Sequence, residues 1–175
     1  MKLTEYDVSF AVKEFVIKNG YTVITWNPPG SQGTFTIPNP AKDPTYKGQT
    51  GSESPDLIAF KNDEMLILEA KDSNKKCISD IYKIKDLLSN QPRKELLFNI
   101  CNSQMKALGI DFNAYKCKIK MGIAIPNFIN YDDIVREFPD ISLYLVNQLI
   151  PSWNNKVINN KNEIQKAFSV TLIQK

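Results

Sequence analysis

The chain has 175 residues with 22 basic and 19 acidic side chains, and its net charge of +3 is only a weak indication of polyanion binding. The complete absence of histidine excludes Ser-His-Asp triads, Cys-His pairs and histidine-ligated zinc. Three cysteines without C-x-x-C spacing indicate reduced core residues. No stretch is apolar enough to span a membrane and no signal peptide opens the chain, so we expect a cytoplasmic protein of one domain with no membrane partner.

The first elements are predicted from capping residues and periodicity. Thr4 and Asp7 resemble a capping box, and apolar residues at helical spacing follow them, which predicts a helix over residues 4–19. Residues 21–26 are rich in β-branched and aromatic side chains and predict a strand. A segment rich in proline and glycine then covers residues 27–54. Its length is typical of a functional loop or of a flexible surface segment, and both interpretations stay open.

Two apolar runs follow, on either side of Asn62-Asp63, a residue pair suited to a two-residue hairpin turn. Counting back along both strands of that hairpin places Asp56 directly opposite Glu69. Side chains alternate along a strand, so Lys71 lies on the same face as Glu69. The hairpin therefore gathers two acids and one base at its open end.

Opposed carboxylates on paired strands repel each other, because their Cβ atoms are about 4.5–5.5 Å apart. A divalent cation would turn that repulsion into ligation, and Mg²⁺ prefers carboxylate oxygens while keeping several waters. A solvated ion pair on an edge hairpin is the alternative. The hairpin is apolar on both faces, however, which predicts that both faces are covered and that these charges are partly buried. We therefore interpret Asp56, Glu69 and Lys71 as a metal-dependent catalytic site.

The remaining elements are predicted from apolar periodicity and from helix-breaking residues. We expect a short strand within residues 34–37, a helix capped by Ser73 or Asn74 and running to about Leu88, a helix from Pro92 to Leu108, a strand over 117–125, a helix over 131–138, a strand over 141–146, a helix over 154–168 and an edge strand over 170–173. This order predicts an α/β protein with a central mixed sheet and helices on both faces.

The segments Pro55-Asp56 and Glu69-Ala70-Lys71, with this order of elements, resemble the PD-(D/E)XK nuclease superfamily over residues 4–125. The resemblance implies a restriction-endonuclease-like α/β/α sandwich and a single nuclease domain over residues 1–175. It also implies that Asp56, Glu69 and the Ala70 carbonyl bind Mg²⁺, with Mn²⁺ able to substitute. Lys71 would orient the attacking water, and phosphodiester hydrolysis would leave 5′-phosphate ends.

Further site residues follow from the same resemblance. Many members of the superfamily add an acid from the first helix, for which Glu5 and Glu14 are candidates, and Glu53 could replace it. We expect the 27–54 loop to approach the DNA. The residues predicted to contact DNA are Lys47, Gln49, Ser52, Ser54, Lys75 and Arg93.

Three functions remain open at this point. The first is a type II restriction endonuclease of a bacterial, archaeal or phage system, which cuts double-stranded DNA at a specific sequence. Cutting both strands requires two active sites, so we expect a homodimer or a partner nuclease subunit. The second is a structure-selective nuclease that resolves DNA junctions or acts in repair. The third is a non-catalytic DNA-binding subunit on the same fold.

Overall fold

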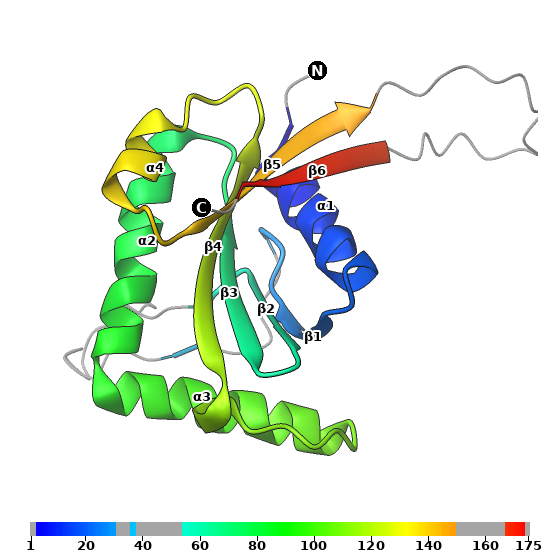
Figure 1. The fold of residues 1–175 in the computed structure, drawn as a ribbon, viewed down its shortest axis with the longest axis vertical. Helices are drawn as coiled ribbons and strands as arrows, with labels where there is room; N and C mark the ends of the chain where they lie inside the picture. Colours follow the sequence, from blue (N-terminus) through cyan, green and yellow to red (C-terminus); the bar gives the residue numbers. More distant parts are fainter. Residues whose placement is uncertain (1–2, 31–35, 38–53, 150–166, 174–175) are drawn as a thin grey trace, which may run out of the picture.

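The computed structural model describes residues 3–30, 36–37, 54–149 and 167–173. These residues form a six-stranded sheet with the strand order β1-β2-β3-β4-β5-β6 and with helices on both faces (Figure 1). The predicted α/β class, with a central mixed sheet flanked by helices, is confirmed. No helix within the described residues is both long and apolar enough to cross a membrane.

The elements have the following bounds. The helices are α1 (Glu5–Lys18), α2 (Asn74–Ser89), α3 (Gln91–Ala107) and α4 (Asp132–Glu137), with a 3-10 turn, η1, at Ala114–Lys116. The strands are β1 (Thr22–Trp26), β2 (Leu57–Lys61), β3 (Glu64–Ala70), β4 (Lys118–Pro126), β5 (Ser142–Leu149) and β6 (Ala167–Ile173).

The sheet is mixed, and its parallel strands have their carboxyl ends at one edge. β1, β2 and β3 pair antiparallel, β3, β4 and β5 pair parallel, and β6 pairs antiparallel with β5. The helices α2 and α3 connect β3 to the parallel strand β4. The carboxyl ends of β3, β4 and β5 therefore meet at the same edge of the sheet, the place where α/β proteins commonly hold their ligands.

The hairpin of β2 and β3 has the predicted register. Lys61 pairs with Glu64 and Leu57 pairs with Leu68, so that Asp56 and Glu69 are the next residues along the two strands. Asn62 in the turn has a φ of 54°, a left-handed conformation that asparagine tolerates well. Hairpin register follows from the turn, which explains why the sequence was enough to predict it.

Both faces of the hairpin are buried, as its apolar pattern predicted. One face packs with α1 in a cluster that includes Val8, Val12, Leu57, Leu66 and Leu68. The other face packs with α2 and α3 in a cluster that includes Ile58, Met65, Ile67, Leu87 and Leu97. A third cluster joins α2 and α4 to β4 and β5. The helices therefore lie in two layers, α1 on one side of the sheet and α2, α3 and α4 on the other (Figure 1).

The predicted helix ends agree with the structure in most cases. Thr4 and Asp7 form the expected reciprocal capping box at the start of α1. Pro92 lies in the first turn of α3, where its missing N–H has no partner to lose. Ser73 is the N-cap residue of α2, but its side chain makes no capping hydrogen bond.

Two predictions need correction or lie partly outside the described residues. The helix predicted over residues 154–168 is wrong at its end, because β6 begins at Ala167, and the rest of that range lies outside the described residues. The edge strand predicted over 170–173 is present within β6. Of the strand predicted over 34–37, Ile37 forms an isolated bridge and is fully buried, while residues 34 and 35 are outside the described part.

Candidate active site

The residues singled out from the sequence lie together at the carboxyl edge of β3, around an open pocket of about 290 Å³. Glu69 is the penultimate residue of β3, and Lys71 directly follows that strand. The backbone N–H of Lys71 donates to the carbonyl of Ala124 at 2.9 Å, which continues the pairing of β3 with β4 beyond the last strand residue. The pocket is lined by Ser54, Pro55, Asp56, Glu69, Lys71, Asp80, Lys83, Ile84 and Leu87.

Asp56 is held in place from both sides. Its carboxylate Oδ2 accepts a hydrogen bond from the backbone N–H of Ala70 at 2.8 Å, which ties the start of β2 to the end of β3. Its backbone carbonyl accepts from the N–H of Asn27 at 2.8 Å. The Asn27 side chain donates to the Pro55 carbonyl at 2.8 Å and to Ser54 Oγ at 3.0 Å. The residue after β1 therefore fixes the whole Ser-Pro-Asp segment.

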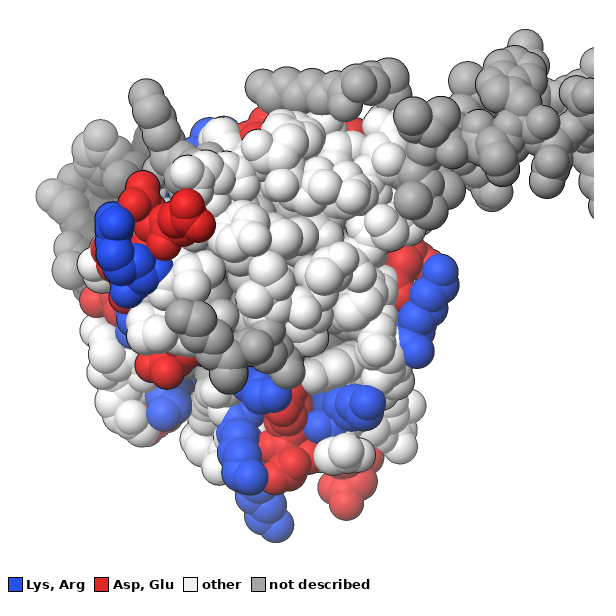
Figure 2. Space-filling model, turned by 45° about the horizontal axis from the view of Figure 1, so that its top comes forward, with Lys and Arg blue, Asp and Glu red and all other residues white. Residues whose placement is uncertain are grey.

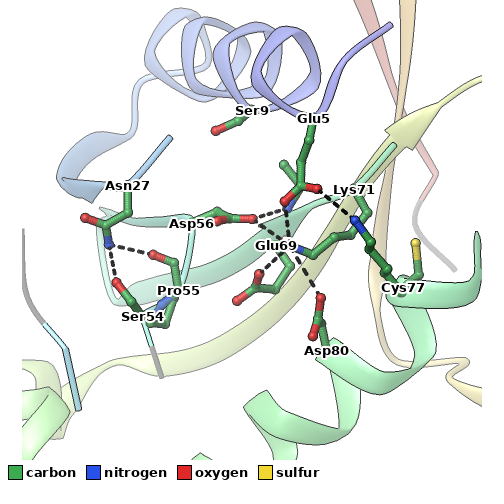
Figure 3. A network of polar contacts seen from close by, with 12 residues as sticks. Glu5, Ser9, Asn27, Ser54, Pro55, Asp56, Glu69, Lys71, Cys77 and Asp80 are labelled. Atoms are coloured by element: carbon green, nitrogen blue, oxygen red, sulfur yellow. Dashed lines mark hydrogen bonds and ion pairs between the residues drawn. The ribbon is translucent and has the colours of Figure 1, made fainter. Parts of the chain in front are cut away.

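The ammonium group of Lys71 lies among four carboxylates (Figure 3). Its Nζ is 3.0 Å from Glu5 Oε1, 3.3 Å from Asp56 Oδ2, 3.3 Å from Glu69 Oε2 and 3.4 Å from Asp80 Oδ2. The four acids come from α1, the start of β2, the end of β3 and α2. The site therefore lies where both helical layers reach the edge of the sheet.

The cluster holds more negative than positive charge. Of the described lysines that contact these four carboxylates, only Lys71 is buried, with 7% of its surface exposed. Two further lysines pair with the outer acids, Lys76 with Glu5 at 3.9 Å and Lys83 with Asp80, and their side chains are largely exposed. Four carboxylates thus face three ammonium groups, and only one of those groups is shielded from water.

The pKa values follow from this imbalance. Burial raises the pKa of Glu69 well above its ordinary value, and the neighbouring charge of Asp56 raises it further against the opposing effect of Lys71. Burial alone would lower the pKa of Lys71, but Glu69 and Asp56 outweigh it and raise that pKa. Lys71 is therefore protonated. Burial also raises the pKa of Cys77 to about 12, so this thiol beside the cluster is neutral.

The chemistry of the donors fits Mg²⁺. Within the described residues, no group of three or more histidine, cysteine, aspartate or glutamate side chains is arranged by itself to hold a metal ion. Mg²⁺ does not require such a cage, since it is commonly held by one or two carboxylates with waters and substrate oxygens. Asp56 and Glu69 supply two largely buried carboxylates, and a cation between them would offset their repulsion.

The candidate auxiliary acids, Glu5, Glu14 and Glu53, differ in where the structure places them. Glu5 reaches the site from the first turn of α1 and contacts Lys71. Glu14 does not come to this cluster: it pairs with Lys13 at 3.2 Å, more than two helical turns further along α1. Glu53 lies outside the described residues. Of the candidate acids on the first helix, the structure therefore brings Glu5 to the cluster and not Glu14, and the role of Glu5 stays a prediction.

Asp80 is a site residue that the sequence analysis missed. It lies on α2 between Cys77 and Ile84, residues that pack into the core, and it is only 9% exposed. A helical stripe with apolar residues at this spacing predicts a core position for Asp80. An acid at such a position was a signal, because buried carboxylates without partners are costly.

The predicted DNA contacts are only partly within the described residues. Ser54 lines the pocket. Arg93 is buried and donates to Asp86 at 2.9 Å, a position within the α2–α3 packing that counts against a role in contacting DNA. Lys75 belongs to α2, but its side chain is outside the described part, as are Lys47, Gln49 and Ser52. The described residues therefore include the pocket lining but not residues 38–53, which precede Ser54 in the chain.

The distribution of surface charge gives little indication of a DNA-binding face. Figure 2 shows basic and acidic side chains next to each other around the rim of one face, whose centre is uncharged. The described residues on this face therefore do not form a broad basic surface of the kind that binds DNA without sequence preference.

No protein-family model, no curated protein and no solved structure matches the chain.

Proposed function

We propose that this chain is a Mg²⁺-dependent DNA endonuclease with a restriction-endonuclease-like fold. The observation that carries the proposal is the convergence of Asp56, Glu69 and Lys71 at one open pocket, with the two acids supplied by adjacent paired strands. The order of helix, strand, hairpin and crossover helices around a mixed sheet supports the assignment to the PD-(D/E)XK superfamily.

Asp56 and Glu69 would hold the metal, and the carbonyl of Ala70 remains the predicted third ligand. When bound, Mg²⁺ would neutralise phosphate charge and lower the pKa of a coordinated water. The protein contributes a rigid position for the Asp56 carboxylate, since its side chain is held by the N–H of Ala70 and its backbone by Asn27. A bound cation would also offset the repulsion between Asp56 and Glu69, which contributes to the raised pKa of Glu69 when no metal is bound.

Lys71 acts as a fixed cation. Its raised pKa means that it cannot serve as a general base at neutral pH, because a base must be able to accept the proton. Its Nζ can instead donate hydrogen bonds to the attacking water and to a phosphate oxygen. Turnover by a Lys71→Gln variant close to that of the wild type would contradict this role.

The substrate is DNA in this proposal, and the first form of the proposal is a type II restriction enzyme that cuts both strands as a homodimer or with a partner subunit. The structure-selective form uses the same chemistry on branched or unpaired DNA. A non-catalytic subunit is disfavoured by the cluster itself. A binding module would gain nothing from four acids around one buried lysine, since their mutual repulsion destabilises the fold.

The direct test is incubation of the purified protein with an unmodified plasmid of known sequence and Mg²⁺ or Mn²⁺, followed by mapping of the ends. We expect metal-dependent cleavage that leaves 5′-phosphates and is blocked by chelator. Discrete fragments would identify a sequence-specific enzyme, whereas preference for forked or branched substrates would identify a structure-selective one. Intact DNA of every form, at full occupancy of the protein by metal, would contradict the proposal.

A further inference from the structure

Three aromatic rings cluster on α1 and at the end of β1, next in the chain to Glu5 and Asn27 of the candidate active site. Tyr6 and Phe10, one turn apart on α1, are nearly parallel, with ring centroids 6.4 Å apart and an interplanar angle of 11°. Trp26, the last residue of β1, is tilted against both, with its centroid 6.2 Å from each. Side chains from two elements therefore form one continuous aromatic surface.

This cluster is joined to the site through the backbone at two points. Tyr6 directly follows Glu5, whose carboxylate contacts Lys71. Trp26 directly precedes Asn27, which holds the segment containing Asp56. Figure 3 shows α1 running along the border of the acid cluster, with Glu5 and Ser9 on the turns nearest to it. The rings and the carboxylates therefore keep a fixed relation to each other.

The cluster lies at the border of the core, because Trp26 is partly buried against the core cluster that joins α1 to the hairpin. Trp26 donates from Nε1 to Ser9 Oγ at 2.8 Å, and the ammonium of Lys13 lies 4.2 Å from the centroid of its ring. The side of α1 that packs on the sheet consists of other residues, among them Val8 and Val12. Tyr6 is 48% exposed. Tyr6 therefore presents one exposed ring that is backed by two half-buried aromatic side chains, an arrangement that can hold a flat ligand against the Tyr6 ring.

Resting on the nuclease function proposed above, we infer that Tyr6, supported by Phe10 and Trp26, stacks on an unpaired base next to the phosphodiester bound at Asp56 and Glu69. Flat aromatic rings bind bases of any sequence by stacking, because every base has a π-face. A base inside a duplex has both faces covered by its neighbours. The surface therefore selects DNA with an unpaired base beside the cleaved bond, which favours the structure-selective form of the nuclease.

The charges around the rings agree with a neutral partner such as a base. Lys13, whose ammonium lies over the rings of Trp26 and Phe10, is already paired with Glu14 at 3.2 Å. It therefore stiffens the cluster and is not needed to hold a phosphate. The phosphate would lie in the pocket, which Lys71 lines.

The test measures binding of two short DNAs, a fully paired duplex and the same duplex with a forked end. A Glu69→Gln background prevents cleavage. We expect Tyr6→Ala to weaken binding of the forked DNA by about fivefold to a hundredfold, as the loss of one stacked base predicts, and to leave the duplex unaffected. Tyr6→Phe should retain binding because it keeps the ring. Tyr115→Ala is the matched control, since Tyr115 is 53% exposed and lies on η1, away from the carboxyl edge.

The outcomes separate the inference from the proposed function. Metal-dependent cleavage in which Tyr6→Ala cuts forked DNA as well as the wild type does would overturn the stacking role and leave the nuclease proposal standing. Forked-DNA binding that depends on the Tyr6 ring, without cleavage by the wild type, would support stacking and contradict the nuclease. A change in the solution mass of Tyr6→Ala without any change in DNA binding would overturn the inference and identify the rings as a subunit contact.

Discussion

Strand β3 carries a glutamate near each end, and the two have opposite surroundings. Glu64, at the amino end, accepts a hydrogen bond from the Tyr21 hydroxyl at 2.5 Å and pairs with Lys120 at 2.7 Å. Glu69, near the carboxyl end, shares the single ammonium of Lys71 with three other carboxylates. The charge of the glutamate at one end of β3 is therefore compensated by its own partners, whereas the glutamate near the other end has only a share of one cation.

The pKa values record this difference. Burial would raise the pKa of Glu64, but the hydrogen bonds from Lys120 and Tyr21 outweigh it and lower that pKa. At Glu69 burial and Asp56 both raise the pKa, and Lys71 only partly opposes them. Glu64 thus stabilises the fold as an ordinary ion pair. Glu69 is kept at a cost that the fold alone does not explain, and such residues cluster at functional sites.

The largest expected effect is on activity. Glu69→Gln should lower metal-dependent cleavage by at least about a thousandfold, because a lost metal ligand removes several kcal/mol of transition-state stabilisation. Glu64→Gln, the matched control on the same strand, should cleave normally and lose about 1–2 kcal/mol of unfolding free energy. The measurements are initial cleavage rates and urea unfolding. Equal activity of the two variants would abolish the distinction between the ends of β3.

The second effect is on stability, through the lysines. Lys71→Gln leaves four carboxylates without their shared buried cation and should lower the unfolding free energy by about 3–5 kcal/mol in metal-free buffer. Added Mg²⁺ should restore part of this loss. Lys120→Gln removes the partner of Glu64 at a half-exposed position, and about 1 kcal/mol or less is expected there. Equal losses in the two variants, measured by urea unfolding, would contradict a special role for the Lys71 cluster.

The third effect is on the pH dependence of stability without metal. The pKa of Glu69 is higher in the folded protein than in the unfolded chain. Its contribution to the free energy of unfolding is therefore fully present below about pH 4, and it is lost as the pH rises through the pKa of the folded state. Over that window the wild type should lose up to about 1.4 kcal/mol per pH unit relative to Glu69→Gln. Glu64 has a lowered pKa, so its contribution is present above about pH 4 and is lost as the pH falls. Parallel curves for wild type and Glu69→Gln would refute the raised pKa.

The hairpin at the centre of this comparison could be predicted from the sequence because its determinants are local. A turn suited to Asn62 and Asp63 sets the register, and the register alone brings Asp56 and Glu69 to the same end. The apolar residues on both faces likewise predicted that helices cover the hairpin on both sides. Charge repulsion between opposed acids then indicated a cation without any knowledge of tertiary structure.

The rest of the site could not be predicted in the same way, because it depends on how distant elements pack. Glu5 and Glu14 are both acids on α1, and only the docking of that helix decides which one reaches Lys71. Asp80 is separated from Glu69 by the start of a helix whose direction the sequence does not give. Arg93 seemed available for DNA because nothing in the sequence indicates its burial against Asp86.

The smallest effect tests Asp80, the acid that contacts Lys71 from α2 at 3.4 Å. Asp80→Asn should lower apparent Mg²⁺ affinity by about tenfold, as is typical when a residue that orients the metal-binding groups is removed. It should not destabilise the metal-free protein, because three carboxylates still surround the lysine. Asp133→Asn is the control, since Asp133 forms an exposed pair with Arg136. Calorimetric Mg²⁺ titration checks both variants. Unchanged Mg²⁺ affinity in Asp80→Asn would show that Asp80 does not contribute to cation binding, which would leave Glu5, Asp56 and Glu69 as the acids that matter at this end of β3.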